Sequence, residues 1–307
     1  MSGRPGMFRQ QRTLAVACAL VATCLGIAYL VAAGAPASRS IVNAAAFLLG
    51  LVALVGIGGA MPQISRHSGP LLLVMGLSLL ATALLGSAAD GASRWIMIGP
   101  LSVQPSLVLM PFMAVTFARY PTLAGCLGIA VAALALALQP DRAMAGVLAF
   151  AMAVLAIARP SRLSAGALTA SVAAFLLSMT RADILPAVPY VDRILFTAFE
   201  VHILAGVAVW SGALLLLVPP IVGWRSNDGL GHAHLVFGAV WLGCIAAAAL
   251  GNYPTPVVGY GGSAILGYLL TFAFLPASAG SADEQAAAPG EDGAATRPEF
   301  HRSASLA

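Results

Sequence analysis

Apolar residues fall into long blocks along the chain, and polar residues are confined to short segments between them. A bilayer core of about 30 Å needs around 20 apolar residues in a helix, so each block is a candidate membrane span. The pattern predicts an all-α polytopic membrane protein with about ten transmembrane helices, both termini on one side, and one long eighth span. The expected spans are 13–33, 41–62, 71–88, 106–119, 122–139, 143–158, 164–180, 193–223, 233–250 and 263–277.

The composition excludes a soluble fold, because 60% of the 307 residues are apolar and only 8% are charged. An ordinary soluble domain has about a quarter of its residues charged. The chain contains no lysine, and a cytoplasmic N-terminus would put ten of its fifteen arginines on the cytoplasmic side. This asymmetry favours cytoplasmic N- and C-termini. The arginines are therefore explained by topology, and no basic face for a nucleic-acid partner is expected.

The chain is expected to divide into a cytoplasmic N-terminus (1–12), a transmembrane domain (13–277) and a disordered cytoplasmic tail (278–307) rich in Ala, Gly, Ser and acidic residues. The first apolar block exceeds the 7–15 residues typical of a signal-peptide core, so we expect an uncleaved first helix. The four cysteines are far apart within apolar blocks. We interpret them as small buried hydrophobes, with no disulfide or metal site.

Four connecting segments hold an unusual share of the polar, Gly and Pro residues, namely 89–106, 138–142, 181–193 and 251–263. In the predicted topology all four open on the extracytoplasmic side. Irregular backbone at membrane depth is tolerated only where it is buried in protein or lines a wet cavity. We therefore expect a cavity on that side.

Motifs in these segments resemble those of the SEDS family (shape, elongation, division and sporulation), to which FtsW and RodA belong. Asp192 followed by Glu200 resembles the family's T-D-F-I-F-A-x-x-x-E-E segment. The other three matches, to G-x-x-R-W-I…Q-P-S-E, Q-P-D-L-G and P-F-V-S-Y-G-G-S, are Gly91-Ala92-Ser93-Arg94-Trp95-Ile96 with Gln104-Pro105-Ser106, then Gln139-Pro140-Asp141, and Pro256-Val257-Val258-Gly259-Tyr260-Gly261-Gly262-Ser263.

The resemblance implies a SEDS-type helix bundle and a peptidoglycan glycosyltransferase that polymerises lipid II at the outer face of the bacterial cytoplasmic membrane, during cell division or cell-wall growth. It also implies a class B penicillin-binding protein as partner, besides membrane lipid. The family's essential carboxylate maps onto Asp192, which is the expected catalytic residue, with Glu200 in support. The expected substrate-binding residues are Arg94, Trp95, Gln104, Ser106, Asp141, Arg142, Tyr260 and Ser263.

The chemistry of such a transfer suits these residue types. It needs a base for the acceptor hydroxyl and positive charge for the departing diphosphate. Asp192 is the candidate base, and Arg94, Arg142, Arg181 and Arg193 are available for the diphosphate. A divalent cation held by Asp192 and the substrate phosphates is an alternative, although no carboxylate cluster requires it.

Each of these residues also has a structural interpretation. Asp192 could cap the following helix, and Arg94 with Trp95 could be an interfacial anchor. Gln104-Pro105-Ser106 could start a helix, and Tyr260-Gly261-Gly262-Ser263 could shape a turn into the last one. Inside the long eighth span, Glu200 is expected to order the bundle or a cavity wall, and His202 to form an interhelical hydrogen bond.

Two rival functions remain open. The chain departs from the family's pattern at Leu107 and Met110, where a glutamate and a basic residue are usual, and its segment before Asp192 is short. These departures favour a non-catalytic scaffold that binds lipid-linked precursor or divisome partners. Alternatively, Glu200 and His202 within a span could form the relay of a transporter or flippase, although no internal repeat supports alternating access.

Overall fold

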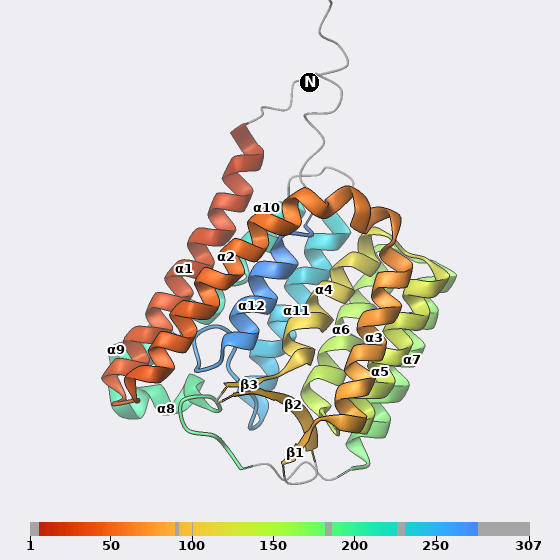
Figure 1. Ribbon diagram of the computed structural model, residues 1–307. Helices are drawn as coiled ribbons and strands as arrows, with labels where there is room; N and C mark the ends of the chain where they lie inside the picture. The colour runs from red at the N-terminus through yellow and green to blue at the C-terminus, as the bar shows by residue number, and fades with distance from the viewer. Residues whose placement is uncertain (1–5, 90–91, 100, 182–185, 226–230, 276–307) are drawn as a thin grey trace, which may run out of the picture.

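The computed structural model describes residues 6–89, 92–99, 101–181, 186–225 and 231–275, and within them a bundle of long helices with one small sheet (Figure 1). The helices cover the apolar blocks of the sequence. Their bounds are α1 Gly6–Ala32, α2 Ala37–Arg66, α3 Ser68–Leu85, α4 Pro105–Arg119, α5 Leu123–Leu138, α6 Arg142–Ala158, α7 Arg162–Met179, α8 Ile194–Val201, α9 Ile203–Leu215, α10 Val218–Arg225, α11 Gly231–Leu250 and α12 Gly262–Phe272.

The helices confirm the predicted all-α polytopic membrane fold. By length and composition, six described segments could cross a membrane: Arg12–Ala32, Ala37–Ile57, Ser68–Leu85, Arg162–Met179, Ile203–Arg225 and Gly231–Leu250. Four further apolar helices, α4, α5, α6 and α12, are shorter. The count of about ten spans stays a prediction. The expected tail, 278–307, lies outside the described residues.

Close helix packing in the bundle depends on glycine. A Cβ atom at Gly128 of α5 would lie 2.5 Å from the Leu72 carbonyl carbon of α3, and one at Gly76 would lie 2.4 Å from the Gly128 oxygen. Helices in a membrane gain little from the hydrophobic effect, so they associate where small residues let their backbones approach. The α3–α5 contact is of this kind.

The prediction of one continuous eighth span was wrong. His202 has an extended backbone (φ −168°, ψ 148°) that separates α8 from α9. The Trp210 indole donates to the Leu195 carbonyl at 2.8 Å, and a Cβ atom at Gly206 would lie 2.3 Å from the Phe199 ring. In a continuous helix, residues 195 and 210 would be about 22 Å apart. The chain therefore reverses at His202, and α8 packs back on α9.

The segment 89–106, expected to be an irregular loop, contains strands. β1 (Ser87–Ala89), β2 (Ala92–Ile98) and β3 (Leu101–Val103) form an antiparallel sheet in that order. In the β2–β3 hairpin Ile96 pairs with Val103 and Ile98 with Leu101, and Gly99 adopts a positive φ of 59° at the turn. Glycine accepts this backbone without steric cost.

Basic residues join the helices at the end of the bundle away from the sheet, which is the upper end in Figure 1. Arg119 donates to the Phe274 carbonyl at 2.6 Å, and Arg159 donates to the Ala118 carbonyl at 3.0 Å. His232 of α11 also lies 3.1 Å from that Ala118 oxygen. Arg119 and Arg159 therefore lie together at the end of the bundle away from the sheet. Which end is cytoplasmic stays a prediction.

Candidate functional site at the Asp192 end

The four polar segments meet at one end of the bundle, here called the Asp192 end. The Gln104 side chain of the first segment bonds Asp141 of the second, and its backbone N–H donates to Ser263 of the fourth. The third and fourth segments are joined by a backbone hydrogen bond from Thr255 to Val191, and by a bridge between Asp192 and Pro254. The four segments therefore lie together, as expected, and which side of a membrane they face stays a prediction.

Asp192 is buried in this junction, with 8% of its surface exposed. One carboxylate oxygen, Oδ2, accepts the backbone N–H of Val188 at 2.8 Å. Burial raises the pKa of the Asp192 carboxyl above its usual value, and the Val188 hydrogen bond and the Arg94 charge partly offset that rise. Asp192 does not cap α8, because the N-cap position belongs to Arg193 and has no side-chain hydrogen bond. The capping interpretation was wrong.

Arg94, a residue of β2, is buried, with 4% of its surface exposed. Its guanidinium donates to the carbonyl of Gln139 at 3.4 Å and to that of Pro140. A guanidinium fixed on main-chain oxygens inside the protein is no interfacial anchor, so that interpretation was also wrong. Trp95, the next residue, is only partly buried. Arg94 therefore links the first two segments and places its charge near Asp192.

Asp141 organises a buried polar cluster. Its Oδ1 caps α6 by accepting the Met144 N–H at 3.1 Å, as the cap position of a helix favours. Its Oδ2 accepts from the Gln104 amide at 3.1 Å and from the Ser106 hydroxyl at 3.4 Å. Gln104, Ser106, Asp141 and Ser263 are all less than 9% exposed. Their polar groups are engaged with one another, so the cluster holds the segments together.

A second connection, from α2 to the third and fourth segments, was missed by the sequence analysis. Asn43 is fully buried; its amide donates to the Gly259 carbonyl at 2.9 Å and its oxygen accepts the Gly261 N–H at 3.1 Å. Arg39 donates to the Pro189 carbonyl at 2.7 Å. A lone asparagine inside an apolar block was the available signal, because polar residues within a span are costly.

Arg39 also makes cation–π contacts with two tyrosines. Its guanidinium carbon lies 4.8 Å from the centre of the Tyr190 ring and 5.0 Å from that of Tyr260. Cation–π contacts of this kind favour arginine. The backbone N–H of Tyr260 also donates to the Tyr190 carbonyl at 2.8 Å. Tyr260, expected to bind substrate, is therefore part of this clamp, whose members are Arg39, Asn43, Tyr190 and Tyr260.

The fourth segment enters the bundle. Val258 is completely buried, and it sits where Gly26 of α1 and Gly212 of α9 leave room, since Cβ atoms at these glycines would lie 2.5 Å from it. Val257 has a positive φ of 65°, which a β-branched residue rarely adopts. Tyr190 and Arg193 also have positive φ values, 67° and 59°. Such backbone strain clusters at functional sites. Here it occurs on both sides of Asp192 in the third segment, and again in the fourth segment, which pairs with Asp192.

The remaining candidates lie towards the surface. Arg142 donates to the carbonyls of Ser178 and Arg181, whereas the Arg181 and Arg193 side chains are exposed. Glu200 is exposed on α8, not inside a span as expected. His202 accepts the Leu204 N–H at 3.1 Å and so caps α9, so the expectation of an interhelical bond was wrong. The reversal after α8 explains both corrections.

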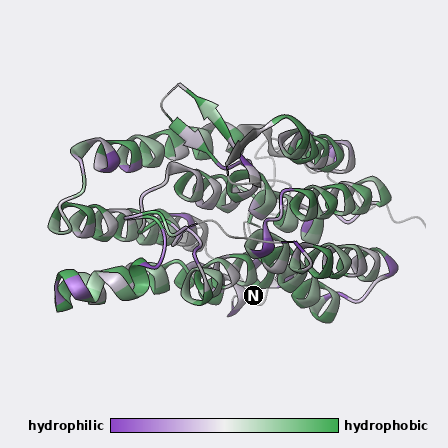
Figure 2. Cartoon of the chain, turned by 90° about the horizontal axis from the view of Figure 1, so that it is seen from below, coloured by the Kyte–Doolittle hydropathy of each residue, from purple (hydrophilic) through white to green (hydrophobic). Residues whose placement is uncertain are grey.

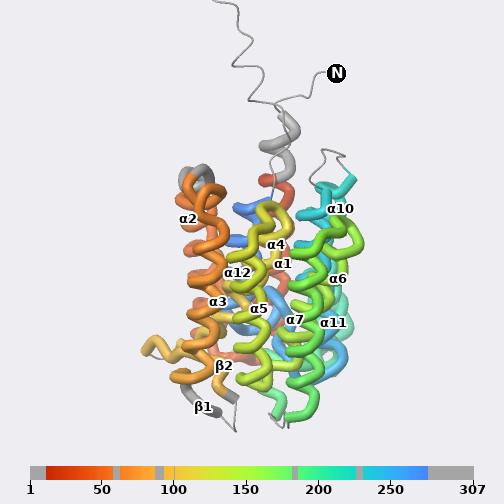
Figure 3. Tube along the Cα trace, turned by 90° about the vertical axis from the view of Figure 1, so that its right-hand side faces the viewer, coloured from red at the N-terminus to blue at the C-terminus, as the bar shows by residue number. Residues whose placement is uncertain are grey.

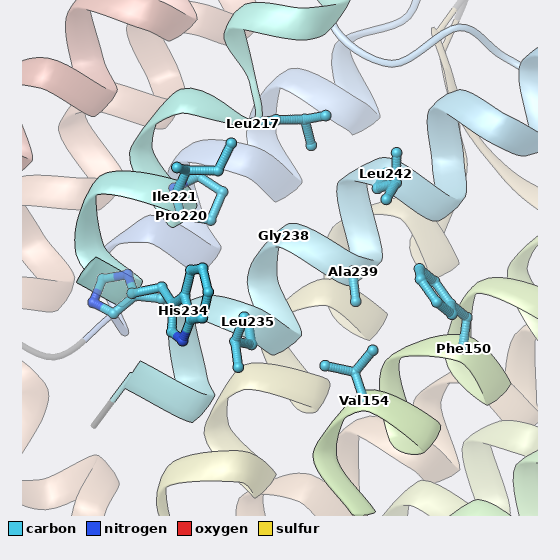
Figure 4. A pocket seen from close by; sticks show the side chains of 11 residues that line it. Phe150, Val154, Leu217, Pro220, Ile221, His234, Leu235, Gly238, Ala239 and Leu242 are labelled. Carbon is cyan, nitrogen blue, oxygen red and sulfur yellow. The ribbon is translucent and has the colours of Figure 1, made fainter. Parts of the chain in front are cut away.

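Figure 4 shows a pocket of about 240 Å³ at the other end of the bundle. Its lining comes from α6, α10, α11 and the turn before α10, and is almost entirely apolar. None of the expected site residues lines it. The lining residues are Phe150, Val154, Leu217, Pro220, Ile221, Trp224, His234, Leu235, Gly238, Ala239 and Leu242. The pocket is therefore separate from the candidate site residues. A cavity at the Asp192 end stays a prediction.

Metal ligands do not gather in the part of the chain that the structure describes. Among those residues, no three His, Cys, Asp or Glu side chains come together. Asp192 and Asp141 are the buried carboxylates of the junction, and Asp141 is engaged by its cluster. A divalent cation at Asp192 would therefore have to draw most of its oxygen ligands from substrate phosphates and water.

Comparison with known proteins places these features in a family context. A family model for cell cycle proteins, FtsW/RodA/SpoVE, matches residues 8–199, which include Asp192. A probable peptidoglycan glycosyltransferase FtsW of Shewanella sediminis is 31% identical over 110 residues, covering 33% of this chain and 27% of that protein. Its counterpart in Nitrosococcus halophilus is 34% identical over 109 residues, covering 31% and 28%. The alignments thus span little more than a quarter of the curated relatives.

Solved structures resemble the chain over most of its length. The rod shape determining protein RodA of Thermus thermophilus has a TM-score of 0.62 at 19% identity, and an aspartate-to-alanine mutant of it has 0.63 at 20%. Both comparisons cover 85% of this chain and 94% of the other. A chain of a peptidoglycan synthase complex has a TM-score of 0.55 at 17% identity, covering 84% of this chain and 95% of that one. At these identities the likeness concerns the fold.

Proposed function

We propose that this chain, which belongs to the FtsW/RodA/SpoVE family of cell cycle proteins, is a peptidoglycan glycosyltransferase that polymerises lipid II. The observation that carries the proposal is the buried Asp192 carboxylate at the junction of four polar segments, with the Arg94 charge acting on it. The relatives named peptidoglycan glycosyltransferases support the same activity. The junction would face the outside of the cytoplasmic membrane, in the topology that the arginines favour.

In the proposed reaction Asp192 takes the proton of the acceptor hydroxyl. The acceptor oxygen then attacks the anomeric carbon of the donor sugar, and the bond from that carbon to the diphosphate breaks. A carboxyl group whose pKa is raised by burial is a better base near neutral pH than an ordinary aspartate. The exposed Arg181 and Arg193 flank the Asp192 segment and suit the leaving diphosphate, because guanidinium groups bind phosphate oxygens in pairs.

The buried residues expected to bind substrate take a different role in this proposal. Gln104, Ser106, Asp141 and Ser263 bond one another, and Arg94 bonds main-chain carbonyls. We therefore propose that these residues position the first, second and fourth segments relative to one another, because their polar groups already form the hydrogen bonds between these segments. Tyr260 belongs to the clamp on Arg39. Trp95 and Arg142, which are partly exposed, remain candidates for substrate contact.

The test is polymerisation of fluorescent lipid II by the purified chain, with and without a class B penicillin-binding protein, the partner that the proposal implies. Wild type is compared with Asp192→Asn, which keeps the shape of the side chain and removes its basicity. Glycan strands made by wild type and lost in Asp192→Asn, with precursor binding retained, are the expected result. Equal product from both proteins would sink the role of Asp192.

A scaffold that binds precursor without catalysis is the second candidate, and Leu107 and Met110 favour it. Both are buried in α4, and the Leu107 carbonyl packs against Gly267 of α12. The two charged positions of the family pattern are thus replaced by apolar packing. Precursor binding without product, in the presence of the transpeptidase, would select this function. The transporter alternative needs Glu200 and His202 inside a continuous span, whereas Glu200 lies near the end of α8 and His202 separates α8 from α9.

A further inference from the structure

The β2–β3 hairpin exposes apolar side chains on both of its faces. Ile96, Met97 and Ile98 are 43%, 52% and 60% exposed, and Leu101 across the turn is 40% exposed. Successive side chains of a strand point to opposite faces. Exposure of three consecutive apolar residues therefore means that neither face of the hairpin tip packs on the protein.

The hairpin projects sideways from the bundle. Figure 2 shows it as a largely hydrophobic ribbon that extends beyond the neighbouring helices, and Figure 3 shows it passing α3 near the lower end of the bundle. The end of α3 beside it is equally apolar, with Leu84 and Leu85 68% and 85% exposed. The tip therefore continues the apolar outer surface of the helices and points away from the bundle, across the direction of the helix axes.

The base of the hairpin is fixed while its tip is not covered. Arg94 at the base is bonded to the carbonyls of Gln139 and Pro140, and Gln104 just after β3 is bonded to Ser263. No charged residue occurs between Arg94 and Arg119. Charged side chains are the ordinary means of keeping an exposed strand in water. Their absence here, together with the sideways direction, selects lipid as the surroundings of the tip.

We propose that the hairpin tip, defined as Ile96, Met97, Ile98 and Leu101, inserts into the membrane leaflet at the Asp192 end. Strand pairing of Ile96 with Val103 and of Met97 with Ser102 satisfies the inner backbone groups. At the depth of the lipid headgroups, the open edges still reach water and lipid oxygens, as unpaired backbone requires. Because Arg94 lies at the base, the inserted tip fixes the depth of the Asp192 junction relative to the membrane surface. The inference does not depend on catalysis.

The first test is spin-label accessibility in lipid nanodiscs, using the full chain with its four native cysteines replaced. A label at Met97→Cys should be reached by dissolved oxygen, which concentrates in lipid, more than by a water-soluble nickel complex. Leu127→Cys on the exposed side of α5 is the lipid control, and Ala187→Cys, exposed in the loop at the same end, is the aqueous control. Ile98→Cys repeats the measurement if Met97→Cys does not fold.

A nickel-accessible label at position 97, matching the Ala187→Cys control, would overturn the proposal. Shielding from both reagents would do the same, because it would show that a protein surface or a second copy covers the tip. A second measurement uses the unsubstituted protein. Phospholipids with a photoreactive group near the glycerol should form adducts on residues 95–101, detected by mass spectrometry, in excess of those on 186–189. Equal or fewer adducts on 95–101 would contradict insertion.

Discussion

The positive charge of Arg94 acts on the carboxyl group of Asp192. Burial raises the pKa of the Asp192 carboxyl, and the positive charge of Arg94, held on the carbonyls of Gln139 and Pro140, lowers it. The Val188 N–H, which donates to the carboxylate, lowers this pKa as well, so one raising effect is opposed by two lowering ones. Changing one of them should move the titration of Asp192 in a known direction.

The first prediction concerns the pH dependence of polymerisation. A base works in its deprotonated form, so the rate should fall as the pH falls through the pKa of Asp192, which burial raises above its usual value. Arg94→Gln removes the charge that lowers this pKa, so the acidic limb of the profile of rate against pH should shift to higher pH. Arg142→Gln is the matched control, because Arg142 is not among the groups that shift the pKa of Asp192. A limb that stays in place in Arg94→Gln contradicts the coupling.

The second prediction separates activity from stability at the same residue. Because burial raises the folded-state pKa of Asp192 above its unfolded value, ionising it costs stability above the folded pKa, and this cost vanishes below the unfolded one. Asp192→Asn removes the cost but keeps an oxygen for the Val188 N–H. We expect Asp192→Asn to be inactive yet at least as stable as wild type at pH 7, with the difference shrinking as the pH is lowered.

Thermal unfolding in detergent at pH 7 and at pH 4 checks this expectation. Asp192→Ala is the comparison variant, because it also loses the acceptor for the Val188 N–H. An unmet backbone donor costs about 1–3 kcal/mol if it stays buried, so Asp192→Ala should melt below Asp192→Asn. If Asp192→Asn melts well below wild type at pH 7, the carboxylate has a structural role that this account lacks.

The sequence predicted the helices well because a membrane span leaves a one-dimensional signal. A run of about 20 apolar residues is visible without knowledge of its neighbours. The break at His202 left no such signal, since apolar residues continue on both sides of it. What reverses the chain there is tertiary: room at Gly206 for the Phe199 ring, and the bond from Trp210 to Leu195.

The site was predictable only in part, for a similar reason. The motif match selected Asp192, Asp141 and Gln104, and the structure brings their segments together. The resemblance carried no role for Asn43 or Arg39, which lie on α2 outside the motifs. Their contribution depends on long-range contacts with Gly259, Gly261 and Pro189. Several matched residues, such as Gln104 and Asp141, are buried and bonded to one another, which is why we propose a positioning role for them instead of substrate contact.

The third prediction tests the clamp on α2. Asn43→Ala leaves the Gly259 carbonyl and the Gly261 N–H without their partner, at a cost of about 1–3 kcal/mol in stability. The loss should also reduce polymerisation, because these glycines belong to the segment that pairs with Asp192. Ser38→Ala, an exposed position in the first turn of the same helix, is the control and should change stability by less than about 0.5 kcal/mol. Unchanged melting of Asn43→Ala would contradict the clamp.

The fourth prediction concerns the α3–α5 contact and compares a destabilising glycine-to-alanine variant with one that should cost no stability. Gly128→Ala puts a methyl group 2.5 Å from the Leu72 carbonyl, and backbone cannot move aside as a side chain can. Overpacking of this kind costs about 1–3 kcal/mol. Gly56→Ala in α2 meets nothing within 4 Å, so it should be neutral or stabilising by up to about 1 kcal/mol through helix propensity. Unfolding by denaturing detergent measures both. A Gly128→Ala variant as stable as Gly56→Ala would show that α3 and α5 do not approach this closely, because the atoms nearest the added methyl group are backbone atoms of Leu72 and Leu73.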